Sequence, residues 1–323
     1  MPCLLKWPGF YGNLLMRRSI CRRFDSRRGA QRAEALPRRF SAGEMSAEAK
    51  GAGKDMDRIL LFIPMYNCQK QIVRVLAQLR GEAAGYLSQV IVVNNRSTDD
   101  GERAVIDWLR DNPLRVPVKL LRNDENYGLG GSHKVAFAYA LAHGFDYVIV
   151  LHGDDQGDVA NLLPYLKSRE YAGYDAFLGA RFMKGSRLQG YSTFRTVGNR
   201  VYDLLFSVGA GRMVYDLGSG LNLYAVKSLE GGWYLKFKDN LMFNCYMLLA
   251  ASSLGQRVRF FPIVWREDDQ VSNVKMLNQA MRTLGMLRDY VRDKKGFLEK
   301  EHRDRIVGAY TAQEIFSAGP AED

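Results

Sequence analysis

The chain has 323 residues, of which 47% are hydrophobic and 25% are charged, and its formal net charge is +11. A chain of this size and composition can bury a large core, which excludes disorder over its whole length and fits one large α/β domain or two small ones. Its four cysteines are scattered and form no CxxC pair. This excludes a zinc site or disulfide framework of the usual spacing and favours a reducing, cytoplasmic setting. No stretch reaches the roughly 18 consecutive apolar residues of a membrane-spanning helix.

The positive charge is concentrated at the start of the chain. Residues 1–45 hold ten Lys and Arg against three Asp and Glu, whereas the rest is nearly balanced. This composition predicts a basic, disordered N-terminal extension over residues 1–57. Three interpretations stay open: sequence upstream of an initiator at Met45 or Met56, a tether to an anionic membrane, or a targeting peptide. No nucleic-acid-binding motif accompanies the basic segment, so nucleic acid is not expected as a partner.

From Arg58 onward, short apolar runs alternate with amphipathic stretches, which is the pattern of βα units around a mostly parallel sheet. The predicted strands and helices come in chain order at 59–63, 69–80, 90–93, 100–110, 118–121, 132–143 and 147–151. Less regular segments follow, with strands at 176–179 and 258–264 and helices at 193–207 and 277–291. The last helix has an apolar stripe that either packs on its own domain or lies on a membrane surface.

Polar clusters follow each of the first four predicted strands. They occupy the carboxyl ends of the strands, which is where open α/β sheets bind ligands, so one shared crevice is expected. The segment 151–158 places three carboxylates, one amide and one imidazole directly after a buried strand. Carboxylate and amide oxygens suit a hard cation such as Mg²⁺ or Mn²⁺. The alternative is a helix N-terminus capped by Asp154 or Asp155.

A glycine-rich turn at 126–132 opens the third predicted helix. Backbone N–H groups at such a place can hold phosphate. A tight turn that simply needs glycine explains the composition equally well. The turn is not a Walker A motif, because no Gly-Lys-Ser/Thr follows at the required spacing.

Four motifs in one order resemble those of family 2 glycosyltransferases. The segment 63–67 resembles the family's IPxYN opening, 92–99 its VVDDxSTD element, 126–131 its NxGxG turn and 152–156 its DxDxQ metal motif. A looser likeness to the dolichyl- or polyprenyl-phosphate mannosyltransferase-like branch continues through Gly179-Ala180-Arg181, 216–220 and 272–275. The resemblance implies a single GT-A domain, Rossmann-like with a mostly parallel sheet flanked by helices, over 58–275. A C-terminal amphipathic helix and tail would follow over 276–323.

The resemblance also implies site residues. The donor, a UDP- or GDP-sugar, would be bound by Pro64, Tyr66, Asn67, Asn95, Gly128 and Arg181. The divalent metal would be held, in order of preference, by Asp154, Gln156 and His152. Lys275 would contact a phosphate-bearing acceptor, because a cation suits that group.

Several positions depart from the family pattern. Cys68 stands where an acid is usual, and Asn94 and Asn95 replace two aspartates, which puts the identity of the nucleotide in doubt. His152 replaces the first metal-binding aspartate. It can ligate Mn²⁺ as a neutral imidazole or bond the diphosphate instead, and Asp155 or Asp158 can supply a second carboxylate.

Transfer to a hydroxyl group needs a base, and the candidates are Asp216, Asp239 and Asp268. A polyprenyl phosphate oxygen is already anionic and needs none. The first hypothesis is therefore a metal-dependent inverting glycosyltransferase acting on a polyprenyl phosphate at the cytoplasmic membrane face. The alternatives are transfer to a polysaccharide or lipid-linked saccharide, and a degenerate, non-catalytic nucleotide-sugar-binding subunit.

Overall fold

The hydrophobic runs of the sequence form the strands of a central sheet in the computed structural model, which describes residues 56–267 and 276–321. Within these residues the sheet has eight strands in the order β10-β3-β2-β1-β4-β7-β5-β8. The strands are β1 (Ile59–Met65), β2 (Gln89–Asn94), β3 (Val118–Asn123), β4 (Tyr147–Leu151), β5 (Ala176–Ala180), β7 (Leu221–Ala225), β8 (Val258–Pro262) and β10 (Ala312–Ala318).

Most neighbouring strands of the sheet are parallel. The exceptions are β7, which is antiparallel to β4 and β5, and β10, which is antiparallel to β3. A separate two-stranded ribbon pairs β6 (Arg187–Gln189) with β9 (Val264–Arg266). The mostly parallel α/β architecture predicted from the sequence is confirmed, and all described residues belong to one compact unit.

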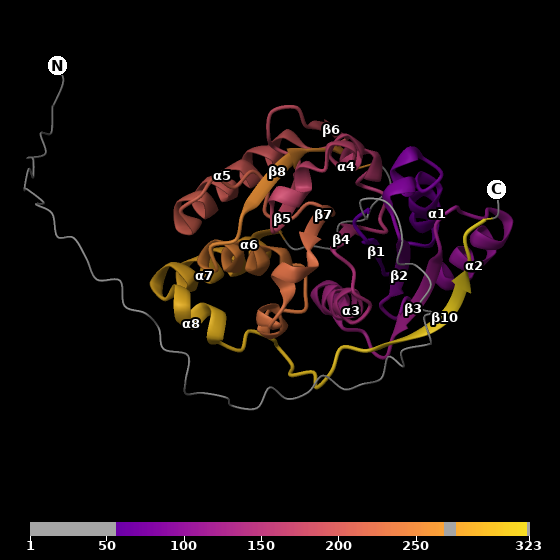
Figure 1. Cartoon of the computed structure of the whole chain (residues 1–323). Coiled ribbons are helices and arrows are strands. Elements are labelled where there is room, and N and C mark those ends of the chain that lie inside the picture. Colours follow the sequence, from indigo (N-terminus) through magenta and orange to yellow (C-terminus); the bar gives the residue numbers. More distant parts are fainter. Residues whose placement is uncertain (1–55, 268–275, 322–323) are drawn as a thin grey trace, which may run out of the picture. The chain divides into compact units, whose positions relative to one another are not determined.

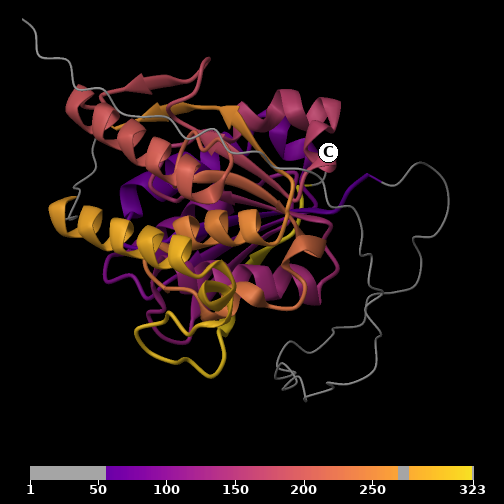
Figure 2. The same ribbon diagram turned by 90° about the vertical axis from the view of Figure 1, so that its left-hand side faces the viewer.

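Helices cover both faces of the sheet, as Figures 1 and 2 show. Alternate residues of β1 enter opposite cores: Leu60 and Phe62 face one, and Ile59, Leu61 and Ile63 face the other. The first core is completed by α3 (Gly128–Ala142), α5 (Thr193–Ala210), α6 (Phe243–Ser253), α7 (Met276–Arg292) and α8 (Lys294–Glu299). The second is completed by α1 (Gln69–Gln78), α2 (Gly101–Asp111) and α4 (Leu163–Ser168).

Short 3₁₀ turns connect several of these elements: η1 (Glu82–Tyr86), η2 (Val159–Leu162), η3 (Glu170–Gly173), η4 (Val226–Leu229) and η5 (Trp233–Lys236). No helix in the described part of the chain combines the length and the apolar content needed to cross a bilayer.

Two differences from the sequence prediction concern the later strands. The run predicted as one strand at 258–264 is divided between β8 and β9, which belong to different sheets. The segment predicted as a C-terminal tail contributes β10, the edge strand beside β3. The main sheet therefore draws on residues beyond the predicted domain boundary at 275.

Candidate active site

A pocket of about 320 Å³ lies at the carboxyl ends of β1, β2 and β4. It forms there because parallel strands deliver their following loops to one edge of the sheet. The site residues predicted from the sequence that line this pocket are Pro64, Tyr66, Asn95, Gly128, His152 and Asp154. The expected shared crevice is therefore present, and each of the four sequence motifs contributes to it.

Asn95 connects two of these loops. Its side-chain oxygen accepts hydrogen bonds from the backbone N–H of Tyr127 (2.8 Å) and the amide of Asn123 (2.9 Å), and its own amide donates to Asn126 (2.8 Å). The side chain is almost fully buried. An amide both donates and accepts, whereas an ionised carboxylate only accepts. Asn95 is thus suited to holding the glycine-rich turn against the end of β2.

The glycine-rich turn has a steric reason for its composition. Gly128 has φ +74°, and a Cβ there would lie 2.5 Å from the backbone oxygen of Asp239. The same oxygen accepts a hydrogen bond of 2.7 Å from the N–H of Gly130. Glycine is needed at this turn because the backbone around residue 239 approaches it closely. The need for a tight turn is therefore enough to explain the glycines of this motif. Gly128 also lines the pocket.

His152 and Asp154 follow β4 and differ in their protonation. Burial raises the pKa of Asp154 to about 6, so the group is mainly ionised at neutral pH. Burial, helped by the charge of Arg181, lowers the pKa of His152 to about 4, so the imidazole is neutral. Its Nε2 is buried and has no hydrogen-bond partner in the described part of the chain. The ring of His133, 6.2 Å away, carries a second such nitrogen.

These residues fit a divalent cation that is held jointly with a diphosphate. No three His, Cys, Asp or Glu side chains among the described residues are grouped to hold a metal alone. One carboxylate and one neutral imidazole with an unpartnered nitrogen are nevertheless present. Mn²⁺ and Mg²⁺ often bind through one or two carboxylates together with substrate phosphates. Asp154 and His152 are therefore the residues that would hold the metal.

The neighbouring acidic residues have other partners. Asp155 pairs with Arg74 (2.6 Å) and Arg266 (3.2 Å), and Asp158 accepts the N–H of Ala160 at the start of η2. Neither lines the pocket, and a role for either as the second carboxylate remains a prediction.

Two further predicted ligands lie outside the pocket lining. Gln156 forms two hydrogen bonds through its backbone. Its N–H donates to the Asp154 carboxylate (3.3 Å), and its carbonyl oxygen accepts from the backbone N–H of Arg266 (2.9 Å). Asn67 accepts two hydrogen bonds from Thr98 and so joins the loops after β1 and β2. Their roles as metal and donor ligands remain predictions, and the contacts described here are structural.

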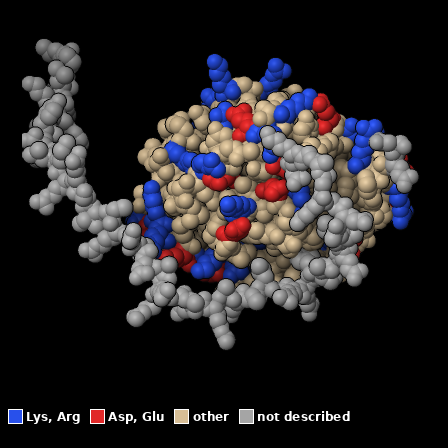
Figure 3. Space-filling model, viewed as in Figure 1, with Lys and Arg blue, Asp and Glu red and all other residues tan. Residues whose placement is uncertain are grey.

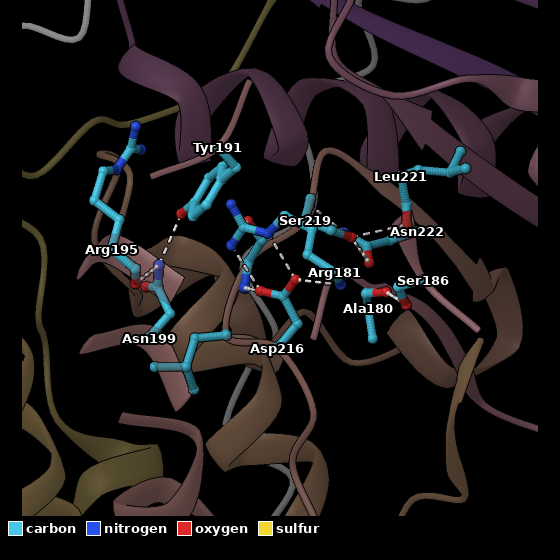
Figure 4. Close-up of polar contacts among 12 residues, drawn as sticks. Ala180, Arg181, Ser186, Tyr191, Arg195, Asn199, Asp216, Ser219, Leu221 and Asn222 are labelled. Atoms are coloured by element: carbon cyan, nitrogen blue, oxygen red, sulfur yellow. Dashed lines mark hydrogen bonds and ion pairs between the residues drawn. The ribbon is translucent and has the colours of Figure 1, made fainter. Parts of the chain in front are cut away.

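Arg181 is bound by Asp216 (Figure 4). Two side-chain hydrogen bonds of 2.7 and 2.8 Å join the guanidinium to the carboxylate, and the backbone N–H of Arg181 adds a third. Burial opposes the charged guanidinium, but Asp216 more than compensates and keeps the pKa of Arg181 above its ordinary value. The rings of Trp265 and Tyr191 lie 5.0 and 5.9 Å from the guanidinium carbon. Arg181 is thus a fixed positive charge near His152 and Asp154, and Asp216 is its partner.

Asp239 is engaged in a different network. It accepts hydrogen bonds from the buried Lys134 (2.7 Å) and from Tyr310 (2.8 Å). Neither Asp216 nor Asp239 lines the pocket. The remaining predicted residues, Asp268 and Lys275, lie outside the described residues, so their roles stay predictions.

Several pocket residues were not predicted from the sequence. Asn126 and Ser132 belong to the glycine-rich motif, and their polar side chains were a usable signal. Leu241, just before α6, reaches the pocket from a distant segment that has no recognisable motif.

The chain matches known proteins in sequence and in fold. Residues 61–216 match the model of the family described as Glycosyl transferase family 2. The chain is 24% identical over 212 residues to an undecaprenyl-phosphate mannosyltransferase of Micrococcus luteus, and the match covers 65% of this chain and 84% of that protein.

Solved structures match the chain to different degrees. Glucosyl-3-phosphoglycerate synthase from Mycobacterium tuberculosis, in complex with Mn²⁺, UDP and phosphoglyceric acid, matches with a TM-score of 0.52 at 14% identity, covering 82% of this chain and 90% of that one. S. aureus TarS 1–349 matches with a TM-score of 0.45 at 15% identity, and the match covers 65% of this chain and 60% of that one. Family model and architecture agree: residues 61–216 form a domain that matches glycosyl transferase family 2, and the chain is a nucleotide-sugar-dependent glycosyltransferase with a GT-A fold.

Proposed function

We propose that the protein transfers a sugar from a UDP- or GDP-sugar to a polyprenyl phosphate, with inversion at the anomeric carbon and with a divalent metal bound beside Asp154. The observation that carries the proposal is the composition of the pocket. Asp154 is the only carboxylate among its described lining residues. A hydroxyl acceptor would need a second group as its base, whereas a phosphate oxygen is already a nucleophile. The likeness to a mannosyltransferase named for undecaprenyl phosphate supports the same acceptor class.

The residues of the pocket would bind different parts of the donor. Tyr66, which is half exposed, offers a ring face to the nucleobase, and Asn126, which also lines the pocket, offers hydrogen bonds. Asn95 holds Asn126 in place. Asp154 and His152 would hold the metal, which when bound would supply positive charge against the diphosphate. Arg181 adds a fixed charge from the side of β5. The acceptor phosphate oxygen forms the new bond to the anomeric carbon, and the bond from that carbon to the nucleoside diphosphate breaks.

The acceptor can be tested directly. Purified protein is incubated with Mn²⁺, radiolabelled UDP- and GDP-sugars and detergent-dispersed polyprenyl phosphate, and label is counted in the organic phase. We expect lipid-linked sugar from the wild-type protein and none from Asp154→Ala. The matched control is Asp107→Ala, because Asp107 is an exposed carboxylate on α2. Label that reaches only a saccharide acceptor contradicts the lipid proposal. Donor binding without any transfer indicates the non-catalytic alternative.

A further inference from the structure

Helix α5 exposes an apolar face to solvent. Six hydrophobic side chains recur along it at helical spacing and are all exposed, between 41% at Leu205 and 81% at Phe194. The opposite face of the same helix is buried, with Phe206 fully enclosed in the core. We call the exposed set the α5 stripe; its members are Phe194, Val197, Val201, Leu204, Leu205 and Val208. An exposed apolar patch of this kind on a folded protein marks a contact surface.

The α5 stripe belongs to a well-fixed helix. Helix α5 has 18 residues, which is about 27 Å of length. It packs against α7, where Gly209 comes so close to Leu287 that a Cβ would lie 2.6 Å from that side chain. Figure 2 shows both helices on the side of the molecule turned towards the viewer. Val291 of α7 is also exposed and adjoins Gly209, so the apolar surface continues onto the second helix.

The charge around the stripe is mainly positive. Between residues 182 and 213 the only acidic residue is Asp203, and it is buried. Lys184, Arg187 and Arg200 are exposed in the same stretch. In Figure 3 the surface over α5 is mainly tan, with blue basic atoms and some red acidic atoms beside it. On the adjoining helix α7, Arg288 and Arg292 are exposed together with Asp289 and Asp293, so exposed cations outnumber exposed acids around the stripe. An apolar helix face with an excess of cations around it matches the chemistry of an anionic bilayer surface.

We propose that the α5 stripe docks on an anionic lipid bilayer, with its apolar side chains in the headgroup region. A second copy of this chain is the less suitable occupant. A two-fold contact would set this surface against itself, and each side would bring more exposed cations than its two exposed acids, Asp289 and Asp293, can pair with, so like charges would face one another. A bilayer containing anionic lipids satisfies both the apolar and the basic side chains.

The stripe is also connected to the candidate active site. Asn199 of α5 donates a hydrogen bond of 2.7 Å to the hydroxyl of Tyr191, whose ring lies beside Arg181. Figure 4 shows this chain of contacts. Docking of α5 therefore places the Arg181 side of the molecule near the membrane, where a lipid-linked phosphate is found. Only this last point rests on the proposed function.

The test is binding to vesicles without any sugar nucleotide, so its failure is distinguishable from failure of the transferase assay. Full-length protein is sedimented with vesicles of phosphatidylcholine, with or without phosphatidylglycerol. Phe194→Ser/Val208→Ser is compared with Met56→Ser/Ile306→Ser, whose two side chains are 75% and 73% exposed. We expect the first double variant to bind anionic vesicles roughly tenfold more weakly and the control to bind like the wild type.

Insertion is measured separately, because the basic N-terminal segment can itself attract anionic vesicles. Val201→Trp and Ile306→Trp are tested with lipids that carry brominated acyl chains, and the fluorescence of the wild-type protein supplies the background of its own tryptophans. Stronger quenching in Val201→Trp than in Ile306→Trp supports the proposal. Equal quenching, equal vesicle binding of the two double variants, or equal binding to neutral vesicles overturns it. A dimer in solution that Phe194→Ser/Val208→Ser dissociates also overturns it, in favour of a second copy.

Discussion

Asp216→Asn removes the negative charge that holds Arg181. The Asp216 side chain is 1% exposed and that of Arg181 14%, so the substitution leaves a largely buried cation without its partner. Removal of one member of a buried ion pair costs about 3–5 kcal/mol. Asparagine retains one acceptor oxygen, and Arg181 has some access to water. We therefore expect the free energy of unfolding to fall by about 3 kcal/mol, near the lower end of this range.

Urea unfolding at pH 7 measures this loss. With a slope of about 3 kcal/mol/M, the midpoint should fall by about 1 M without a change in slope. The control is Asp107→Asn, because Asp107 is 54% exposed and pairs with Arg103 at 3.4 Å. An exposed pair of this kind contributes about 0–1 kcal/mol.

A double-mutant cycle with Arg181→Met separates the lost charge pair from general damage. If loss of the ion pair causes the destabilisation, the free energy of unfolding of the double variant falls by about 2 kcal/mol less than the sum of the two single-variant losses. If Asp216→Asn lowers the free energy of unfolding no more than Asp107→Asn does, or if the effects of Asp216→Asn and Arg181→Met simply add, the ion pair does not stabilise the protein in this way.

Three other predictions concern pH, backbone and metal. Burial, and secondly the charge of Asp216, raises the pKa of Asp203 from 3.8 to about 8, so the folded state keeps a proton that the unfolded state releases between these values. Stability should therefore fall as pH rises from about 4 to about 8, and Asp203→Asn should flatten this fall in urea titrations at several pH values; an unchanged slope would contradict the assignment. Gly128→Ala should destabilise the protein by about 1–3 kcal/mol in thermal unfolding, because of its positive φ and the nearby backbone oxygen. Gly285→Ala on α7, with nothing within 4 Å, should instead stabilise by about 0.5–1 kcal/mol. Mn²⁺ bound to protein, followed by electron paramagnetic resonance, should appear only when a nucleoside diphosphate is added and should weaken in His152→Ala; tight binding of Mn²⁺ alone would exclude the joint site.

The sequence predicted the parallel half of the fold well, because each strand from β1 to β4 is a short apolar run that ends in a polar cluster. It did not predict β7 and β10. Both are antiparallel strands whose partners are distant in the chain, as when Ala312 pairs with Asn123. Such pairing leaves no local periodic signal.

The candidate site was predictable from the sequence only in part. Pro64, Asn95 and Asp154 reach one pocket because the sheet brings the loop tips together. The local turns decide which other side chains reach the pocket. Asn67 has φ +49° and Asp155 has φ +59°, and the spacing of residues in the sequence does not reveal such backbone conformations. The capture of Arg181 by Asp216 likewise depends on contacts between segments that only the folded chain brings together.

The position of β10 has a consequence for synthesis of the protein. Its partner strand β3 leaves the ribosome about 190 residues earlier, which is roughly 10–40 s at ordinary rates of translation. During that interval the outer edge of β3 lacks its neighbour, and an unpaired edge readily binds other strands. A nascent or C-terminally shortened chain without residues 312–318 should therefore need chaperone protection, even though the loops that line the pocket are already made.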